Sequence, residues 1–211
     1  MILHALRIVQ TELETHLSVY APTGDEGDVL LANLSEGLAG GGGGGTVPRD
    51  RLILSVANIK EDKALKNVPN YVRNDVTLTA TYENPPVFLN FLVLVTATHA
   101  NYNNALLYLS RAIRFFQFKN VFTQDNVLPG TLTTAKPTNP LDELETFKLI
   151  FDIYSPSMEE VNHLWGTLGG KQYPFALYLL RMLDLRFRAV QSESGLITEV
   201  VADFYHKKNT N

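Results

Sequence analysis

The residues that could do chemistry in this chain of 211 residues are a run of glycines, Gly40–Gly45, and five scattered histidines. A glycine-rich loop binds phosphate when a Lys and a Ser or Thr follow it, or when its spacing begins a dinucleotide-binding helix, and this run has neither feature. No histidine pair stands at the i, i+4 spacing of a helical metal site or near a short Asp/Glu companion motif. We therefore expect no cofactor and no metal, and interpret the glycine run as a flexible assembly loop or spacer. The histidines are His4, His16, His99, His163 and His206.

Acidic and nucleophilic residues form no catalytic pattern either. Glu159 and Glu160 are adjacent, and adjacent helical residues face different directions, so these carboxylates fit the first turn of a helix better than an acid–base pair. No G-x-S-x-G elbow presents a serine nucleophile anywhere in the sequence. His163 stands close to Trp165, and we interpret it as a hydrogen-bonded structural histidine. We therefore expect that the protein is not an enzyme. A small hydrolase with an unrecognised site is the weakest alternative.

Charge and hydropathy restrict the partners. The formal net charge is -4 at pH 7, whereas a protein that binds phosphate backbones normally carries a basic excess. The most apolar stretch, Val87–Ala97, is about half as long as a membrane helix needs. The opening residues include Glu12 and Glu14, unlike a secretory signal peptide. We expect a soluble protein that starts in the cytoplasm, with no nucleic-acid partner and no membrane span.

Composition indicates a globular chain held together by packing. Hydrophobic residues make up 45% of the chain and charged residues 19%, close to ordinary globular usage. The sequence has no cysteine, so it can form neither a disulfide framework nor a thiolate metal site. Its length is sufficient for a sizeable core, and we expect a single domain over residues 1–211.

Apolar spacing predicts the elements of the first half of the chain. A three-and-four repeat predicts an amphipathic helix over residues 2–17, and alternation predicts strands. Pro85 and Pro86 should separate the last two strands, because proline has no N–H to donate to a ladder. We expect the continuous apolar run after these prolines to be a central strand paired to its predecessor. The predicted strands cover residues 29–34, 52–57, 75–82 and 87–96.

The second half alternates helices and strands. Asn101 or Asn103 can cap a helix that runs to Phe116, and a strand should follow over residues 147–153. Ser157 begins a capping box, and we expect Trp165 to anchor that helix on the sheet, together with Leu164, Leu168 and Phe151. Gly169–Gly170 should end this helix. We interpret the ambiguous segment 175–188 as a strand that returns through a turn at 191–195 into a hairpin strand at 197–201.

Two connections are longer than a compact domain normally contains, and such loops usually contact something. They are residues 37–47, which include the glycine run, and residues 123–142. The fold class is α+β, with about three helices packed on a mainly antiparallel or mixed sheet of about six strands. The residues that we expect at partner-binding surfaces are Arg111, Arg114, Gly40, Gly45, Pro129 and Pro137.

Five segments in order along the chain resemble the cap, or tail-terminator, family of extracellular contractile injection systems, which includes antifeeding prophages and Photorhabdus virulence cassettes. Together with the opening helix, these segments spread the resemblance over nearly the whole chain. The glycine run is not part of that pattern. The segments are Asn58–Asp62, Asn70–Asn74, Tyr82–Asn90, Leu109–Gln117 and Asn162–Lys171.

The resemblance implies a structural subunit that forms a ring, expected to be a hexamer, at the end of a phage-tail-like particle. That ring would end the inner tube and bind the last ring of the contractile sheath, with a tape-measure protein or a second cap protein as further neighbours. The family has no catalytic motif to transfer. The alternative is a protein-binding adaptor of a related secretion machine.

Overall fold

The computed structural model describes residues 1–19, 27–39, 45–63, 69, 71–82, 84, 87–144, 146–185, 192–195 and 199–202. The chain divides into two compact units. The larger consists of Met1–Lys63 with Val87–Leu185, and the smaller consists of Ala64–Pro86 with Arg186–Asn211. The single domain expected over residues 1–211 stays a prediction.

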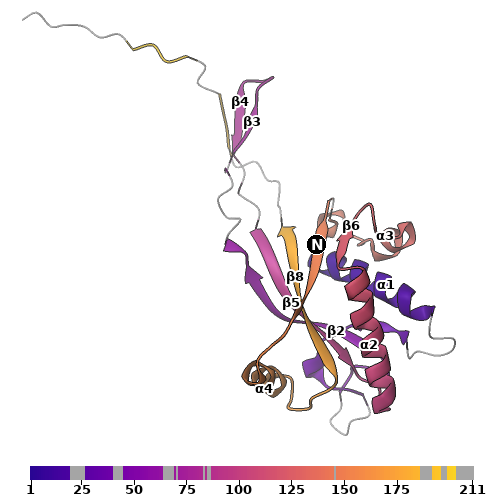
Figure 1. Ribbon diagram of the computed structural model, residues 1–211. Helices are drawn as coiled ribbons and strands as arrows, with labels where there is room; N and C mark the ends of the chain where they lie inside the picture. Colours follow the sequence, from indigo (N-terminus) through magenta and orange to yellow (C-terminus); the bar gives the residue numbers. More distant parts are fainter. Residues whose placement is uncertain are drawn as a thin grey trace, which may run out of the picture. The chain divides into compact units, whose positions relative to one another are not determined.

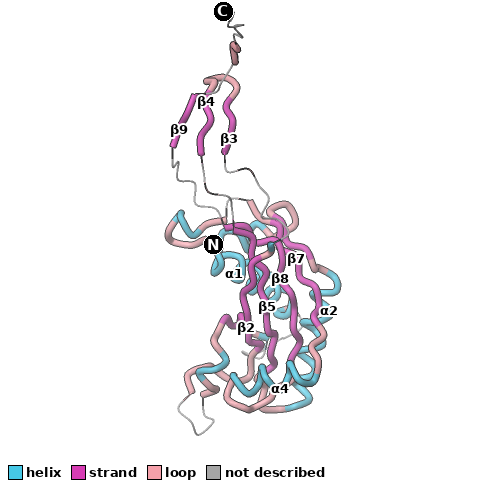
Figure 2. The backbone as a smooth tube through the Cα atoms, turned by 90° about the vertical axis from the view of Figure 1, so that its left-hand side faces the viewer, coloured by secondary structure: helices cyan, strands magenta, loops and turns pink. Residues whose placement is uncertain are grey.

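The larger unit is built on a mixed sheet of six strands in the order β1-β2-β5-β8-β7-β6. β1 runs parallel to β2, and the other neighbouring pairs are antiparallel. Figure 2 shows β2, β5, β8 and β7 side by side. The α+β class and the mixed sheet are therefore confirmed. The strands are β1 (Val29–Leu31), β2 (Leu52–Glu61), β5 (Val87–Ala97), β6 (Val121–Thr123), β7 (Lys148–Tyr154) and β8 (Phe175–Leu185).

Helices α1 (Ile2–Ser18) and α2 (Tyr102–Phe118) cover one face of this sheet (Figure 1). Their apolar stripes pack on the inward-facing residues of alternating strands, as amphipathic helices do. The Phe116 ring of α2 lies 5.0 Å from the Phe151 ring of β7 and 4.6 Å from the Tyr178 ring of β8. Asn101 is the cap of α2, because its side chain accepts a hydrogen bond from the Asn103 N–H at 2.9 Å.

The segment 123–142 is not a loop throughout, contrary to expectation. It contains helix α3 (Pro129–Ala135) and a 3-10 turn, Pro140–Asp142. A helix of seven residues is too short to give a periodic apolar stripe, and its position depends on tertiary contacts with α1. Thr131 and Ala135 are its buried residues.

Helix α4 (Met158–Thr167) lies on the opposite face of the sheet (Figure 1). The predicted capping box is present: Glu160 N–H donates to Ser157 Oγ at 3.2 Å, and Ser157 N–H donates to the Glu160 carboxylate at 2.8 Å. After the helix, Gly169 and Gly170 both have positive φ, which glycine adopts without strain.

The second core lies under α4 and includes Trp165, which is 4% exposed. The Trp165 indole meets the Phe175 ring edge-on at 5.3 Å. Phe151 belongs to the core on the other face of the sheet, so its expected contact with Trp165 was wrong. Adjacent β7 residues alternate between faces, and Phe151 points away from α4. The other buried members are Leu34, from the 3-10 turn Leu34–Glu36, and Leu38, Val47, Ile53, Leu94, Val161 and Leu177.

The smaller unit contains an antiparallel sheet in the order β3-β4-β9. Residues 75–78, predicted to begin a strand, form a turn instead, because Leu78 has a left-handed φ of 51° and cannot continue a ladder. β5 pairs with β2 and β8 and not with its predecessor. The predicted turn at 191–195 is largely strand β9, paired to β4. Of the strand predicted at 197–201, residues 199–201 are not in a strand, so this part of the prediction was wrong, and residues 196–198 lie outside the described residues. The strands are β3 (Tyr71–Asn74), β4 (Thr79–Tyr82) and β9 (Ser192–Gly195).

Candidate assembly surfaces

The outer edge of β2 is a candidate pairing surface. β1 pairs only with residues 52–54 of β2, so within the part of the chain that the structure describes no strand pairs with this edge from Val56 to Glu61. The side chains of residues 56–61 are exposed, and Ile59 is 49% exposed. An uncovered strand edge presents backbone N–H and C=O groups to any extended segment that can pair with them.

A β-bulge lies in the same half of β2. The pairing register between β2 and β5 shifts between Val56 and Asn58. Such a bulge bends the strand and redirects its side chains, and it is common at sheet edges and next to functional sites. The bulge therefore bends β2 in its exposed half, just before Ile59.

An open groove of about 680 Å³ lies beside this edge, on the face that α4 only partly covers. Its apolar lining includes Leu92 of β5 and Leu177 and Leu179 of β8. Charged residues of β2 and α4 also line it, with four carboxylates against one lysine. The groove can therefore receive apolar side chains whose neighbours are basic. The charged residues are Glu61, Asp62, Glu159, Glu160 and Lys60.

Glu160 and Tyr154 form a fixed part of the groove wall. The Tyr154 hydroxyl donates a hydrogen bond to the Glu160 carboxylate at 2.8 Å. The Ser157 backbone N–H and this hydroxyl hold the pKa of Glu160 below its usual value, and the same carboxylate raises the pKa of Tyr154. Glu160 is thus an ionised acceptor whose hydrogen bonds tie the start of α4 to the end of β7.

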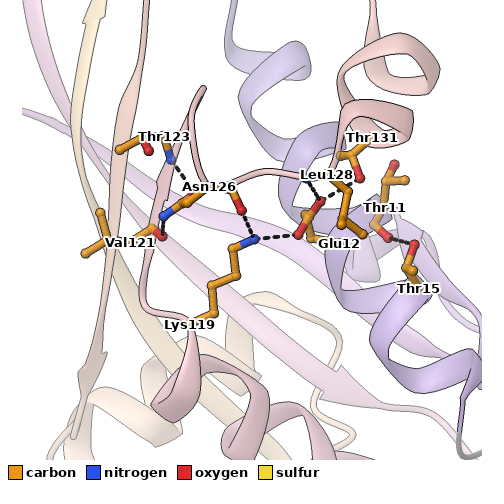
Figure 3. Close-up of polar contacts among 9 residues, drawn as sticks. All are labelled: Thr11, Glu12, Thr15, Lys119, Val121, Thr123, Asn126, Leu128 and Thr131. Carbon is orange, nitrogen blue, oxygen red and sulfur yellow. Dashed lines mark hydrogen bonds and ion pairs between the residues drawn. The ribbon is translucent and has the colours of Figure 1, made fainter.

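The carboxylate of Glu12 organises a different surface, on the α1 side of the molecule (Figure 3). Glu12 is 5% exposed and accepts hydrogen bonds from Lys119 Nζ at 2.7 Å, Leu128 N–H at 2.9 Å and Thr131 Oγ1 at 2.6 Å. Lys119 Nζ also donates to the Asn126 carbonyl at 2.7 Å. These bonds fix the segment between α2 and α3 to α1.

Burial by itself raises the pKa of Glu12, but the hydrogen bonds from Lys119, Thr131 and Leu128 outweigh burial and hold the pKa below its usual value. A buried carboxylate with this many donors is stable as the anion. The arrangement is structural, since every donor comes from the chain itself.

The predicted partner-binding residues that the structure describes lie on several different elements. Arg111 and Arg114 lie on α2, on the side opposite α4, and the Arg111 guanidinium lies 5.1 Å from the centre of the Tyr108 ring. Pro129 begins α3, and Pro137 follows its end. Gly40, Pro85 and Pro86 lie outside the described residues. The partner-binding roles stay predictions.

Gly45 has a local backbone role. A Cβ built on it would lie 2.4 Å from the carbonyl carbon and oxygen of Gly37, so no side chain fits there. Two backbone hydrogen bonds hold these segments close together. Val47 N–H donates to the Gly37 carbonyl at 3.1 Å, and Ala39 N–H donates to the Val47 carbonyl at 2.8 Å. His163 is exposed, with Nε2 3.8 Å from the Glu159 carboxylate. Its structural role stays a prediction.

Sequence reasoning missed the groove and the free half of β2. The segment Asn58–Asp62 was noticed only for its resemblance. Exposure on both faces of a strand gives no periodic signal, which is why these residues did not stand out.

In the described ranges, no group of three or more His, Cys, Asp or Glu residues is placed to hold a metal ion. Over the same ranges, the helices are too short or too polar to span a bilayer.

Comparison with known proteins gives two kinds of match. The model of the family described as the Pvc16 N-terminal domain matches residues 5–199. Among solved structures, the fold is similar to that of the PVC sheath/tube terminator in the extended state, from an extracellular contractile injection system. The TM-score is 0.61 and the identity is 12%, over 100% of this chain and 65% of that chain. This chain therefore spans less than two thirds of that protein's length.

A second solved structure is the anti-feeding prophage cap, described as the AFP tube terminating cap. It matches with a TM-score of 0.46 and 13% identity, over 72% of this chain and 48% of that chain. No curated protein sequence matches the chain.

Proposed function

The chain belongs to the Pvc16 N-terminal domain family, and we propose that it is a structural terminator, or cap, of a contractile injection particle. The family match over residues 5–199 confirms the resemblance noted in the sequence, and it is the observation that carries the proposal. The fold shared with a sheath/tube terminator supports the same role. A structural role is also in keeping with the functional surfaces described above, which are a strand edge and an open groove.

The proposed subunit forms a closed ring, a hexamer, at the end of the particle away from the baseplate. There it ends the inner tube and binds the last sheath ring, with a tape-measure protein or a second cap protein as a further neighbour. Assembly begins in the cytoplasm. A closed ring satisfies every subunit contact, so the ring does not grow further.

The free half of β2 is the proposed sheath-binding element. A terminal segment of a sheath subunit adds as a strand along residues 56–61, so that backbone hydrogen bonds supply affinity and side chains select the partner. The two faces of the sheet differ, because α1 and α2 cover one face while α4 leaves part of the other open. A terminator must offer a binding surface to the tube and sheath on one side of the ring only, because a second such surface on the other side would let growth continue.

A charge on the β2 edge tests this assignment. Ile59→Lys places a lysine on the free edge, and because Ile59 is 49% exposed the fold should tolerate it. The matched control is Leu106→Lys on α2, where the leucine is 44% exposed on the other side of the sheet. A strain that lacks the gene is complemented with each variant, and its particles are examined by electron microscopy for extended sheaths.

Sheath loss with Ile59→Lys and normal particles with Leu106→Lys would support strand addition at β2. Equal sheath retention with both variants would remove the edge from the proposal. Normal particles in the complete absence of the protein would favour the alternative, a protein-binding adaptor of a related secretion machine.

A further inference from the structure

The tip of the β3–β4 hairpin presents apolar side chains to solvent. Val76 is 93% exposed, and Leu78 is half exposed with a φ of 51°. A positive φ is strained for leucine, and strained backbone is usually retained where the conformation serves a function. The tip is also ordered by its own hydrogen bonds. The Asn74 side chain accepts from Val76 N–H at 3.0 Å and Thr77 N–H at 3.2 Å, as in an Asx-turn.

The sheet that carries this tip has almost no core of its own. Among the residues of the smaller unit whose exposure is described, only Ala80 is buried. The Tyr71 and Tyr82 rings pair across the strands at 6.3 Å, yet both remain exposed. Two or three short strands without a covered apolar face are marginally stable in water. This unit therefore needs a partner to cover it.

The larger unit offers the matching surface. The groove beside β2 is lined by apolar side chains, which include Leu179, and by carboxylates. The hairpin brings two apolar side chains, with Arg73 just before the turn. Arg73 contacts Asp75, and a guanidinium has enough donors to bind a second carboxylate at the same time. The apolar side chains of the tip thus match the apolar lining of the groove, and Arg73 can bind one of its carboxylates while it keeps its contact with Asp75.

We propose that in the ring the hairpin tip of one subunit docks in the groove beside β2 of the next copy, with Val76 and Leu78 against the apolar side chains that line this groove. This inference rests on the proposed function, because it supplies the subunit contact of that ring. A cyclic ring needs two different, mutually complementary patches on each chain, and the tip and the groove are such a pair. The side chains that dock and those that receive them come from different copies.

The absence of cysteine from the sequence makes a direct test possible. Two full-length single-cysteine variants, Val76→Cys and Ala57→Cys, carry different tags and are mixed, assembled and oxidised. Ala57 is exposed and lines the groove. A disulfide between differently tagged chains can form only between copies, so the predicted result is a covalent dimer with both tags. In the control, Ser110→Cys, at an exposed position on α2, replaces Ala57→Cys. The mixture of Val76→Cys with Ser110→Cys should give no covalent dimer.

A second variant pair tests the apolar character of the contact. Val76→Asn should abolish the ring, whereas Thr77→Asn adds the same uncharged amide at the same exposed turn and should retain it. Native mass spectrometry of the unmodified chain reports the ring independently. If the ring forms but Val76→Cys cross-links equally to both partners, the docking inference is overturned and the proposed function stands. If tube and sheath are present and no ring forms, both are overturned.

A photo-cross-linker at position 76 in assembled particles identifies the occupant of the tip. Capture of a second copy of this chain supports the inference. Capture of a sheath or tube subunit, with none of this chain, contradicts it.

Discussion

The Glu12 carboxylate and the Lys119 ammonium meet at 2.7 Å, although 107 positions separate them in the sequence. Glu12 is the more deeply buried of the two, and Lys119 reaches it from just after α2. Because the same carboxylate binds Leu128 N–H and Thr131 Oγ1, one side chain of α1 fixes the whole approach to α3. This buried charge therefore ties the start of α3 to α1, while hydrogen bonds of the Asn126 side chain with Thr123 and Val121 order the turn before it.

Glu12→Gln should lower the free energy of unfolding by about 1 to 3 kcal/mol, because it removes a charge-assisted acceptor and leaves Lys119 with a poorer partner. Glu14→Gln is the control on the same helix. Burial, and then the nearby Asp28, raise the pKa of Glu14, so neutralising it should have no cost or should stabilise. Urea unfolding of both variants measures this. Equal stability of the two would contradict the account of Glu12.

His4 should make the fold sensitive to mild acid. Burial lowers the pKa of His4 from 6.5, and its Nδ1 accepts a hydrogen bond from Leu144 N–H at 2.9 Å. The unfolded chain therefore binds the proton more readily, and stability falls as the pH drops below about 6.5 until the folded pKa is passed. The contribution of Glu12 is lost at lower pH, as the pH falls through its depressed folded pKa.

His4→Asn keeps an acceptor for Leu144 N–H but does not titrate, so the loss of stability between pH 7 and pH 5 should become shallower. Ser110→Asn, at an exposed position of α2, changes no titratable group and is the control, so it should keep the slope of the unmodified protein. Denaturant unfolding at the two pH values provides the measurement. An unchanged slope in His4→Asn would show that other groups cause the acid sensitivity.

Trp165→Ala should cost about 3 to 5 kcal/mol, because it leaves a cavity under α4. Trp165→Phe should cost less, since the indole Nε1 is buried without a hydrogen-bond partner in the structure and phenylalanine removes that donor. Thermal and urea unfolding compare the two variants. If Trp165→Ala unfolded like the unmodified protein, the indole would not anchor the helix.

Gly45→Ala should destabilise the fold, because its Cβ would overlap the Gly37 carbonyl group. The control is Gly166→Ala on α4, where the added Cβ meets no described atom within 4 Å beyond its own stretch of helix, and the helix should gain up to about 1 kcal/mol. Unfolding measurements should therefore shift in opposite directions. A neutral Gly45→Ala would mean that the two backbones separate without cost.

Long periodic segments were predictable, and features that depend on distant partners were not. The helix at residues 2–17 and the capping box at Ser157 followed from spacing and side-chain chemistry. The segment 175–188 was ambiguous between helix and strand, and its interpretation as a strand is confirmed over Phe175–Leu185. Alternation suggested a strand from residue 75, but the turn there depends on the Asn74 side chain and on the strained Leu78. The predicted pairing of β5 with the strand before it was also wrong, because a local sequence pattern does not specify which strand lies beside another.

The candidate surfaces were less predictable than the fold. Arg111 and Arg114 were chosen by charge alone, and they lie away from the free edge and the groove. The groove joins side chains from β2, β5, β7, β8 and α4, so only the folded chain shows it. Val76 looked like a core residue of a strand, and its exposure became evident from the turn.

Tube length after deletion of the gene tests the central claim most directly. Electron microscopy of particles from the deletion strain should show ragged or overlong inner tubes, or sheaths that contract prematurely, on baseplates that still assemble. Complementation with the unmodified gene should restore a uniform length. Particles of normal length that retain extended sheaths and still inject, in the absence of the protein, would contradict its role as a terminator.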